Sequence, residues 1–319
     1  MRPLKKVETI LVLIEPAEEY SGELRRCFPE SRVIFSGRDR DTEEEIRDAD
    51  VILGNPPAEF LKDAGKLKLL QLQSAGADAY TPRGILPEGA LLTCATGAYG
   101  PAVSEHMIAS LLSVYKNLHV YRDNQTARRW RCEGAVRSLR GEKVLVLGLG
   151  DIGREFARLA SAFGASVSGV KRNLSCKPDW VEAVYPLDKL PEILPQFDVV
   201  ASVLPSSPET QGLFDRAMLK KMKPGSILVN AGRGSLIDSD ALYDALQKGP
   251  LLAACLDVTD PEPLPPDHPL WGCRNLLLTP HTAGGFLMKE TYHRVWKIAL
   301  ENLSAYAEGR ELKNRIRLE

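Results

Sequence analysis

Three charged side chains in the second half of the chain have types that suit acid–base chemistry on an anion. Arg233 lies among glycines in the run 230–234, and its planar fork of donors matches a 2-oxo acid, whose carboxylate and carbonyl lie in one plane. His281 follows the rigid step Thr279-Pro280 and could give a proton to a carbonyl as a hydride arrives. Glu262 could stabilise the charged form of this imidazole by pairing with it.

Each of these residues also has a purely structural interpretation. Arg233 could neutralise a helix end or a local carboxylate, and Glu262 lies between prolines and could be an exposed loop carboxylate. A lone histidine such as His281 is more often structural than catalytic. All three, however, are predicted at or just beyond the carboxyl ends of parallel strands, where doubly wound sheets place their sites. The combination therefore favours a catalytic site.

A glycine-rich segment predicts a dinucleotide site. The segment Gly148-Leu149-Gly150-Asp151-Ile152-Gly153 follows an apolar run at 144–147 and opens a helical pattern. Gly148 would make the tight turn, Gly150 would let a pyrophosphate approach the backbone, and Gly153 would let helix and strand pack closely. The N–H groups at the start of the helix would then face the anion. The alternative is a glycine-rich turn that binds nothing.

The end of the next predicted strand, 165–170, indicates which dinucleotide is bound. An Asp or Glu at this place would hydrogen-bond the ribose 2′-hydroxyl of NAD and repel a 2′-phosphate. The chain instead has Lys171 and Arg172, and each could make a charge-assisted contact with that phosphate. We therefore predict NADP, and a solvated basic turn is the structural alternative.

Composition limits the classes of partner. The chain has 319 residues, which suits two domains, and its 41 basic and 42 acidic residues leave no large field to attract nucleic acid or an anionic membrane. The apolar stretch near the N-terminus is too short for a signal sequence, and no run is long enough to span a bilayer. The six cysteines and five histidines lack metal-ligand spacings. We therefore expect reduced thiols in the cytoplasm and no metal.

Two stretches of alternating strands and helices must position these residues, and such alternation is typical of parallel sheets. In the first stretch we expect strands at 9–14, 32–35, 51–53, 67–72 and 91–94. A helical pattern then runs from Pro101 to about Tyr121. In the second stretch we expect strands at 144–147, 167–170, 199–203, 227–229, 253–258 and 276–278. A terminal helix from about Met288 to Ala307 is expected to join the first domain.

Further motifs extend from about Ser74 to Gly285. They are Phe197-Asp198-Val199-Val200, Leu204-Pro205, Pro208-Glu209-Thr210, Met222-Lys223-Pro224-Gly225, Asn230-Ala231-Gly232-Arg233-Gly234, Asp257-Val258-Thr259-Asp260-Pro261-Glu262-Pro263-Leu264, His268-Pro269-Leu270-Trp271 and Thr279-Pro280-His281. Together with the glycine-rich segment, these motifs make the chain similar to the D-isomer-specific 2-hydroxyacid dehydrogenase family. Within that family, it resembles the NADP-preferring glyoxylate/hydroxypyruvate reductases.

The resemblance implies an α/β fold with two doubly wound parallel-sheet domains and a cleft between them. A flavodoxin-like substrate domain would comprise residues 1–100 and 287–319, and a Rossmann dinucleotide-binding domain would comprise residues 101–286. Arg233 would hold the substrate carboxylate and carbonyl, His281 would be the acid or base, and Glu262 would be its partner.

The resemblance also implies further contacts. Backbone N–H groups of a loop at Ser74, Ala75 and Gly76 would bind the substrate carboxylate. Further cofactor contacts would come from Leu204, Pro205, Thr210, Ala231, Asp257 and Gly284. Two positions depart from the usual family pattern. Lys171 replaces the acid at the ribose, which supports NADP, and Val203 stands where many relatives have His or Asn.

We therefore expect reversible hydride transfer between NADP(H) and a small 2-oxo or D-2-hydroxy acid, with glyoxylate or hydroxypyruvate as the preferred substrate. The family implies a homodimer, formed through the nucleotide domain and its connecting helix. One alternative is a formate or phosphite dehydrogenase, which has the same architecture. Another is a non-enzymatic sensor of NAD(P)H on the same fold, which would show no turnover.

Overall fold

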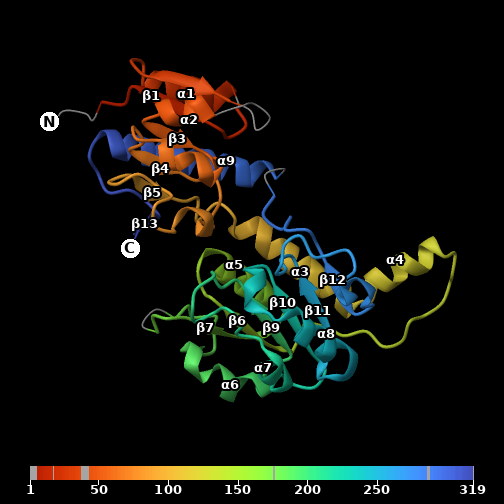
Figure 1. Ribbon diagram of the computed structural model, residues 1–319. Helices are drawn as coiled ribbons and strands as arrows, with labels where there is room; N and C mark the ends of the chain where they lie inside the picture. The colour runs from red at the N-terminus through yellow and green to blue at the C-terminus, as the bar shows by residue number, and fades with distance from the viewer. Residues whose placement is uncertain (1–5, 17, 37–42, 175–176, 286–287, 319) are drawn as a thin grey trace. The chain divides into compact units, whose positions relative to one another are not determined.

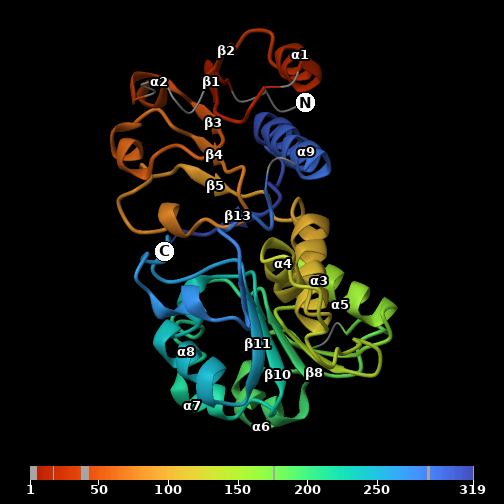
Figure 2. The ribbon, with the colours of Figure 1, turned by 90° about the vertical axis from the view of Figure 1, so that its right-hand side faces the viewer.

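The computed structural model describes residues 6–16, 18–36, 43–174, 177–285 and 288–318 (Figures 1 and 2). The chain divides into two compact units. The first unit comprises Met1–Tyr99 and Phe286–Glu319, and the second unit comprises Gly100–Gly285. Residues 286 and 287, where the second expected domain boundary falls, lie outside the described residues, as does Cys176.

In the described part of the first unit, six strands form one sheet in the order β13-β5-β4-β3-β1-β2. Their bounds are β1 Thr9–Val12, β2 Arg32–Phe35, β3 Val51–Leu53, β4 Leu69–Gln71, β5 Leu91–Thr93 and β13 Arg315–Ile316. All neighbours pair in parallel except β13, which runs antiparallel to β5. The central strands β3 and β4 are buried on both faces and apolar except for Gln71, as is typical of parallel strands covered by helices.

The first unit has three α-helices among its described residues, and one of them comes from the far end of the chain. They are α1 Glu18–Cys27, α2 Glu43–Asp48 and α9 Lys289–Ala307. In α9, Trp296 is fully buried and its ring stacks on Tyr20 of α1, with centroids 5.4 Å apart. The Asn302 side chain donates to Gln71 Oε1 of β4 at 2.7 Å. Helix α9 is therefore part of the core of the first unit.

The second unit holds a parallel sheet of seven described strands in the order β12-β11-β10-β9-β6-β7-β8. Their bounds are β6 Lys143–Leu147, β7 Ser166–Val170, β8 Val184–Tyr185, β9 Val199–Ser202, β10 Ser226–Asn230, β11 Leu251–Leu256 and β12 Leu276–Leu278. The strand order reverses between β6 and β9, and ligands of doubly wound sheets bind beyond the carboxyl ends at such a reversal. The predicted α/β class with two parallel sheets is confirmed.

The α-helices described in the second unit are α3 Gly100–Tyr115, α4 Leu118–Thr126, α5 Asp151–Ala162, α6 Leu190–Ile193, α7 Arg216–Lys220 and α8 Ser239–Lys248. Figure 2 shows α3 and α5 on one side of the sheet and α7 and α8 on the other. Short 3-10 helices lie at η1 Ala58–Asp63 and η2 Asp78–Tyr80 in the first unit, and at η3 Leu187–Lys189, η4 Leu194–Gln196, η5 Gly234–Leu236 and η6 Pro269–Gly272 in the second. No helix within the described ranges is both long and apolar enough to cross a membrane.

The continuous helix predicted from Pro101 to Tyr121 is wrong. Asn117 has φ 55° and separates α3 from α4. Asparagine adopts this left-handed conformation more readily than most residues, so the apolar spacing of the helix does not reveal the break. The short strands β8 and β13 were also not predicted, because two-residue pairings at a sheet edge leave no periodic signal.

Candidate active site

The loop of residues 279–283 is held by one buried carboxylate, that of Asp257. Strand β11 ends at Leu256, two residues earlier than predicted, so Asp257 is the first residue beyond its carboxyl end. Asp257 Oδ1 accepts from the Thr279 hydroxyl at 2.6 Å and from the Thr282 N–H at 2.9 Å, and Oδ2 accepts from the Ala283 N–H at 3.0 Å. The loop is thus fixed on both sides of His281.

His281 is oriented by its main chain and by Glu262. Its N–H donates to the Asp257 carbonyl at 2.8 Å, and its φ is 51°. Its Nδ1 lies 2.6 Å from Glu262 Oε1, and both side chains are about half exposed. Because a carboxylate only accepts, Nδ1 carries the hydrogen of this bond, and Nε2 is the ring atom that can exchange a proton with a substrate.

Arg233 follows β10, the neighbour of β11 in the sheet. Fully buried Asn230 holds its loop, because the amide nitrogen donates to the Arg233 carbonyl at 2.8 Å and Oδ1 accepts from the Gly232 N–H at 3.1 Å. The flanking glycines, Gly232 and Gly234, let the backbones of neighbouring loops approach closely. A Cβ at Gly232 would lie 2.6 Å from the Leu204 carbonyl oxygen, and one at Gly234 would lie 1.8 Å from that of Thr259. The loop therefore has no room for larger residues at either position.

The glycine-rich segment has the local geometry of an anion site. Gly148 has φ 95°, and a Cβ at Gly153 would lie 1.8 Å from the Gly148 carbonyl oxygen, so strand and helix approach too closely for any side chain. A Cβ at Gly150 would meet nothing within 4 Å, and no side chain caps the start of α5 at Gly150. The first turn of α5 can therefore receive a pyrophosphate.

Asp151, the first residue of α5, lies beside the start of α3. A Cβ at Gly100 would lie 2.8 Å from Asp151 Oδ1. Ile152 is half-buried in the same turn. Behind the segment, Val203 is the side chain nearest to Gly153, since its Cγ2 would lie 3.1 Å from a Cβ there. Val203, which departs from the family pattern, therefore lies next to Gly153, where β6 and α5 approach each other closely.

The basic pair after β7 has an acidic neighbour that the sequence did not reveal. Arg172 Nη2 lies 3.2 Å from Glu209 Oε2, and both side chains are largely exposed. The Lys171 main chain donates to the Tyr185 carbonyl at 3.1 Å. The residues of this ion pair are 37 positions apart, so neither periodicity nor motif spacing could have predicted it. The place where we expect the cofactor ribose to bind therefore has an acidic side chain beside its two basic ones.

The other expected cofactor residues lie at strand ends of the second unit. Thr210 is buried, and its hydroxyl donates to the Pro205 carbonyl at 2.7 Å, so it closes the turn that follows Leu204. The Ala231 N–H donates to the Ser202 carbonyl at 3.1 Å. Gly284 is half-buried at the end of the 279–283 loop. These residues shape loops at the carboxyl edge of the sheet.

The expected substrate loop, Ser74 to Gly76, belongs to the first unit, and Asn55 organises it. Asn55 Nδ2 donates to Ser74 Oγ at 2.9 Å, and Asn55 Oδ1 accepts from the Ser74 N–H at 3.3 Å. Ser74 Oγ donates in turn to the Gly76 carbonyl at 2.6 Å. Ser74, Ala75 and Gly76 are all half-exposed.

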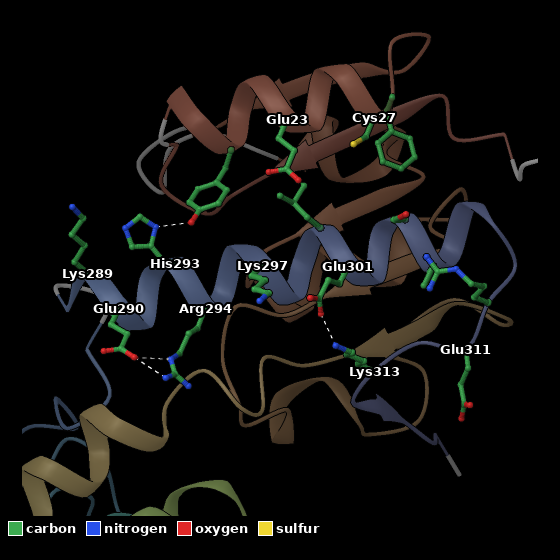
Figure 3. A pocket seen from close by; sticks show the side chains of 16 residues that line it. Glu23, Cys27, Lys289, Glu290, His293, Arg294, Lys297, Glu301, Glu311 and Lys313 are labelled. Atoms are coloured by element: carbon green, nitrogen blue, oxygen red, sulfur yellow. Dashed lines mark hydrogen bonds and ion pairs between the residues drawn. The ribbon is translucent and has the colours of Figure 1, made fainter.

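A groove of about 1020 Å³ in the first unit contains none of these residues (Figure 3). It lies between α1 and α9, and several of the charged side chains that line it pair with one another. Examples are Arg294 with Glu290 and Lys313 with Glu301, each at 2.6 Å. In the part of the chain that the structure describes, no group of three or more His, Cys, Asp or Glu residues is placed to hold a metal.

The fold and these loops define a dinucleotide-binding α/β protein, and comparisons with known proteins give its family. A family model described as "D-isomer specific 2-hydroxyacid dehydrogenase, NAD binding domain" matches residues 108–283. A protein of Corynebacterium melassecola, described as "Uncharacterized protein in proB 3′region", is 32% identical over 89% of this chain and 93% of its own length. The glyoxylate reductase of Aeropyrum pernix is 31% identical over 82% of this chain and 79% of that protein.

Solved structures agree. A D-isomer specific 2-hydroxyacid dehydrogenase family protein from Aeromonas salmonicida has a TM-score of 0.87 at 34% identity, over 98% of this chain and 100% of that one. Another, from Xanthobacter autotrophicus in complex with NADPH and MES, has a TM-score of 0.80 at 26% identity, over 98% of each chain. The chain belongs to the D-isomer specific 2-hydroxyacid dehydrogenase family. It is an NAD(P)-linked oxidoreductase of 2-hydroxy acids, as predicted.

Proposed function

We propose that this enzyme reduces a small 2-oxo acid, glyoxylate or hydroxypyruvate, to the D-2-hydroxy acid with NADPH. The observation that carries the proposal is the 2.6 Å contact between His281 and Glu262. His281 lies on the loop of residues 279–283, which hydrogen bonds to Asp257 hold in place. Support for the substrate class comes from similarity to the glyoxylate reductase of Aeropyrum pernix. We also propose a cytoplasmic enzyme, because the five described cysteines are free thiols.

In the proposed reaction, Arg233 holds the substrate carboxylate and orients the carbonyl beside it. His281 donates a proton from Nε2 to the carbonyl oxygen, and Glu262 stabilises the imidazolium before the transfer and keeps the ring oriented through Nδ1. The bound nicotinamide cofactor supplies the hydride. In the oxidative direction, neutral His281 accepts the proton from the hydroxyl group.

NADP is proposed because Lys171 and Arg172 stand where an acidic residue would select NAD. The family relative from Xanthobacter autotrophicus, whose structure holds NADPH, supports this proposal. The pairing of Arg172 with Glu209 moderates it, because a 2′-phosphate would have to displace or tolerate that carboxylate. We therefore propose a preference for NADPH that is incomplete.

The proposal is tested by following NADPH and NADH oxidation with glyoxylate, hydroxypyruvate and pyruvate. Formate and phosphite oxidation are assayed in parallel with NADP⁺ and NAD⁺. We expect the highest kcat/KM for NADPH with glyoxylate or hydroxypyruvate. A higher value with NADH would overturn the cofactor proposal. Activity confined to formate or phosphite would overturn the substrate proposal, and tight cofactor binding without turnover on any substrate would indicate a sensor.

A further inference from the structure

A second histidine lies near the carboxylate that holds the His281 loop. His106 is on α3, and its side chain is 26% exposed. Its Nε2 lies 3.1 Å from the Thr279 hydroxyl oxygen and 3.8 Å from Asp257 Oδ1. Helix α3 packs against α5 and β11. His106 therefore contacts the loop of residues 279–283 from a separate helix.

The direction of the hydrogen bonds follows from the groups involved. Asp257 Oδ1 also accepts from the Thr282 N–H, so the carboxylate acts as an acceptor and the single hydroxyl hydrogen of Thr279 is directed to it. The Thr279 oxygen is then the acceptor for His106. His106 must therefore carry its hydrogen on Nε2, and the chain of donors runs from His106 through Thr279 to Asp257.

This arrangement fixes the residue two positions before His281. The Thr279 N–H donates to the Leu256 carbonyl at 2.9 Å, and the Thr279 carbonyl accepts from the His281 N–H at 3.1 Å. With its main chain and hydroxyl both held, Thr279 can take one orientation, and Pro280 then allows little freedom before the catalytic ring. Loss of the His106 donor would leave the Thr279 hydroxyl oxygen without that partner in a half-buried place.

We infer that His106 is a positioning residue for His281, acting through the hydroxyl of Thr279. The inference rests on the proposed role of His281 as the proton donor. His106 does not touch substrate in this account; it keeps the loop of residues 279–283 in the one arrangement that directs His281 Nε2 toward the carbonyl. Its removal should therefore lower kcat more than it changes KM for the cofactor.

The test compares two amide replacements. In His106→Gln, the amide nitrogen is separated from Cα by the same number of bonds as Nε2 of histidine, so it can still donate to Thr279. In His106→Asn, the amide nitrogen corresponds to Nδ1 and cannot reach. We expect kcat to fall about tenfold in His106→Asn and His106→Ala and by less than about threefold in His106→Gln. His293→Ala, at a half-buried histidine of α9 in the first unit, should change kcat little.

Two further measurements separate positioning from a general structural role. Thr279→Val should lower kcat, and adding His106→Ala to it should cause no further loss, because the donor then has nothing to act through. Hydrogen exchange of the cofactor-free enzyme should be faster in peptides covering residues 279–285 for His106→Ala and His106→Asn, and unchanged for His106→Gln.

Equal losses in the Gln and Asn variants, or additive losses with Thr279→Val, would overturn the inference. Unfolding midpoints that fall in parallel with kcat would also overturn it, since they would show a purely structural effect. If His281→Ala leaves turnover intact while loop exchange still responds to His106, the proposed role of His281 is wrong and the link from His106 to the loop is retained.

Discussion

At the scale of single residues, His281 combines the side chain that we propose as the proton donor with a backbone conformation that few non-glycine residues adopt. Its φ of 51° is maintained by its own N–H, which donates to the Asp257 carbonyl, and by the pair with Glu262. Such a conformation persists only where the surroundings determine it. The structure therefore fixes the histidine from its main chain as well as from its ring.

We predict that His281→Ala lowers kcat by about a hundredfold or more, because it removes the proton donor. The affinity for NADPH, measured by fluorescence titration, should stay within about twofold, since His281 is not part of the glycine-rich segment. Glu262→Gln keeps a hydrogen-bond acceptor for Nδ1 but removes the charge, so its kcat should lie between those of the wild type and His281→Ala. An unchanged kcat in His281→Ala would exclude the assigned role.

We expect single residues to decide the cofactor preference as well. The double variant Lys171→Asp with Arg172→Ala should lower kcat/KM for NADPH by about tenfold or more and raise NADH use, because it replaces two cations with one carboxylate. Glu209→Gln should act in the opposite direction by releasing Arg172 from its ion pair. Glu192→Gln breaks a comparable exposed pair with Lys189 and is the control. An unchanged NADPH to NADH ratio in the double variant would contradict the proposed recognition of the 2′-phosphate.

At the scale of elements, the first strands of the first unit are joined by a buried carboxylate. Asp50, just before β3, accepts from the Glu8 and Thr9 N–H groups at 2.8 and 2.9 Å and pairs with Lys68 at 2.6 Å. Burial alone would raise the pKa of Asp50, but the hydrogen bond from Lys68 and those from the two N–H groups outweigh it and hold the pKa below its usual value.

The lowered pKa of Asp50 gives a pH dependence with a definite sign. A carboxyl group whose pKa is lower in the folded than in the unfolded state stabilises the fold above the unfolded pKa, and loses that contribution as pH falls through the folded pKa. Urea unfolding of Asp50→Asn should therefore show its largest deficit against the wild type above about pH 5, and a shrinking deficit below the reference value of 3.8. Glu88→Gln, at an exposed carboxylate of the same unit, should show no such trend.

The sequence predicts elements better than it predicts the interactions between them. Strands such as β2, β3 and β12 match their predicted ranges, because each is a short apolar run between polar turns. The break at Asn117 was missed because one left-handed residue does not disturb apolar spacing. The hydrogen bond from Thr279 to Asp257 joins residues 22 positions apart, and the contact of His106 with Thr279 joins residues 173 positions apart. Such contacts depend on how loops cross in space, which no local pattern encodes.

At the scale of the whole molecule, we propose a homodimer formed through the second unit. Helix α4 and the loop after it extend away from the sheet of their own unit (Figure 1). This segment carries Leu118, Trp130 and Val136, which are more than half exposed, and Trp130 is fully exposed. Apolar side chains gathered on one projecting segment are typical of a surface that another chain covers.

Sedimentation velocity should accordingly give about twice the chain mass of 35.2 kDa. Trp130→Glu should shift the protein toward the single-chain mass, because it places a charge on the most exposed apolar side chain of the proposed contact. Phe163→Glu, at an exposed aromatic residue after α5, is the control and should leave the mass unchanged. A wild type that sediments with the mass of one chain at all concentrations would contradict the homodimer.

The route of the chain through its two units has a consequence for protein synthesis. The second unit is one continuous stretch, whereas the first unit lacks α9, with Trp296 and Asn302, until residues 289–307 have been made. On the ribosome, the second unit can fold as soon as it emerges, while the first hundred residues wait with an unfilled core for nearly two hundred more to be added. Residues 1–99 are therefore made before the second unit, but their core is completed only after it.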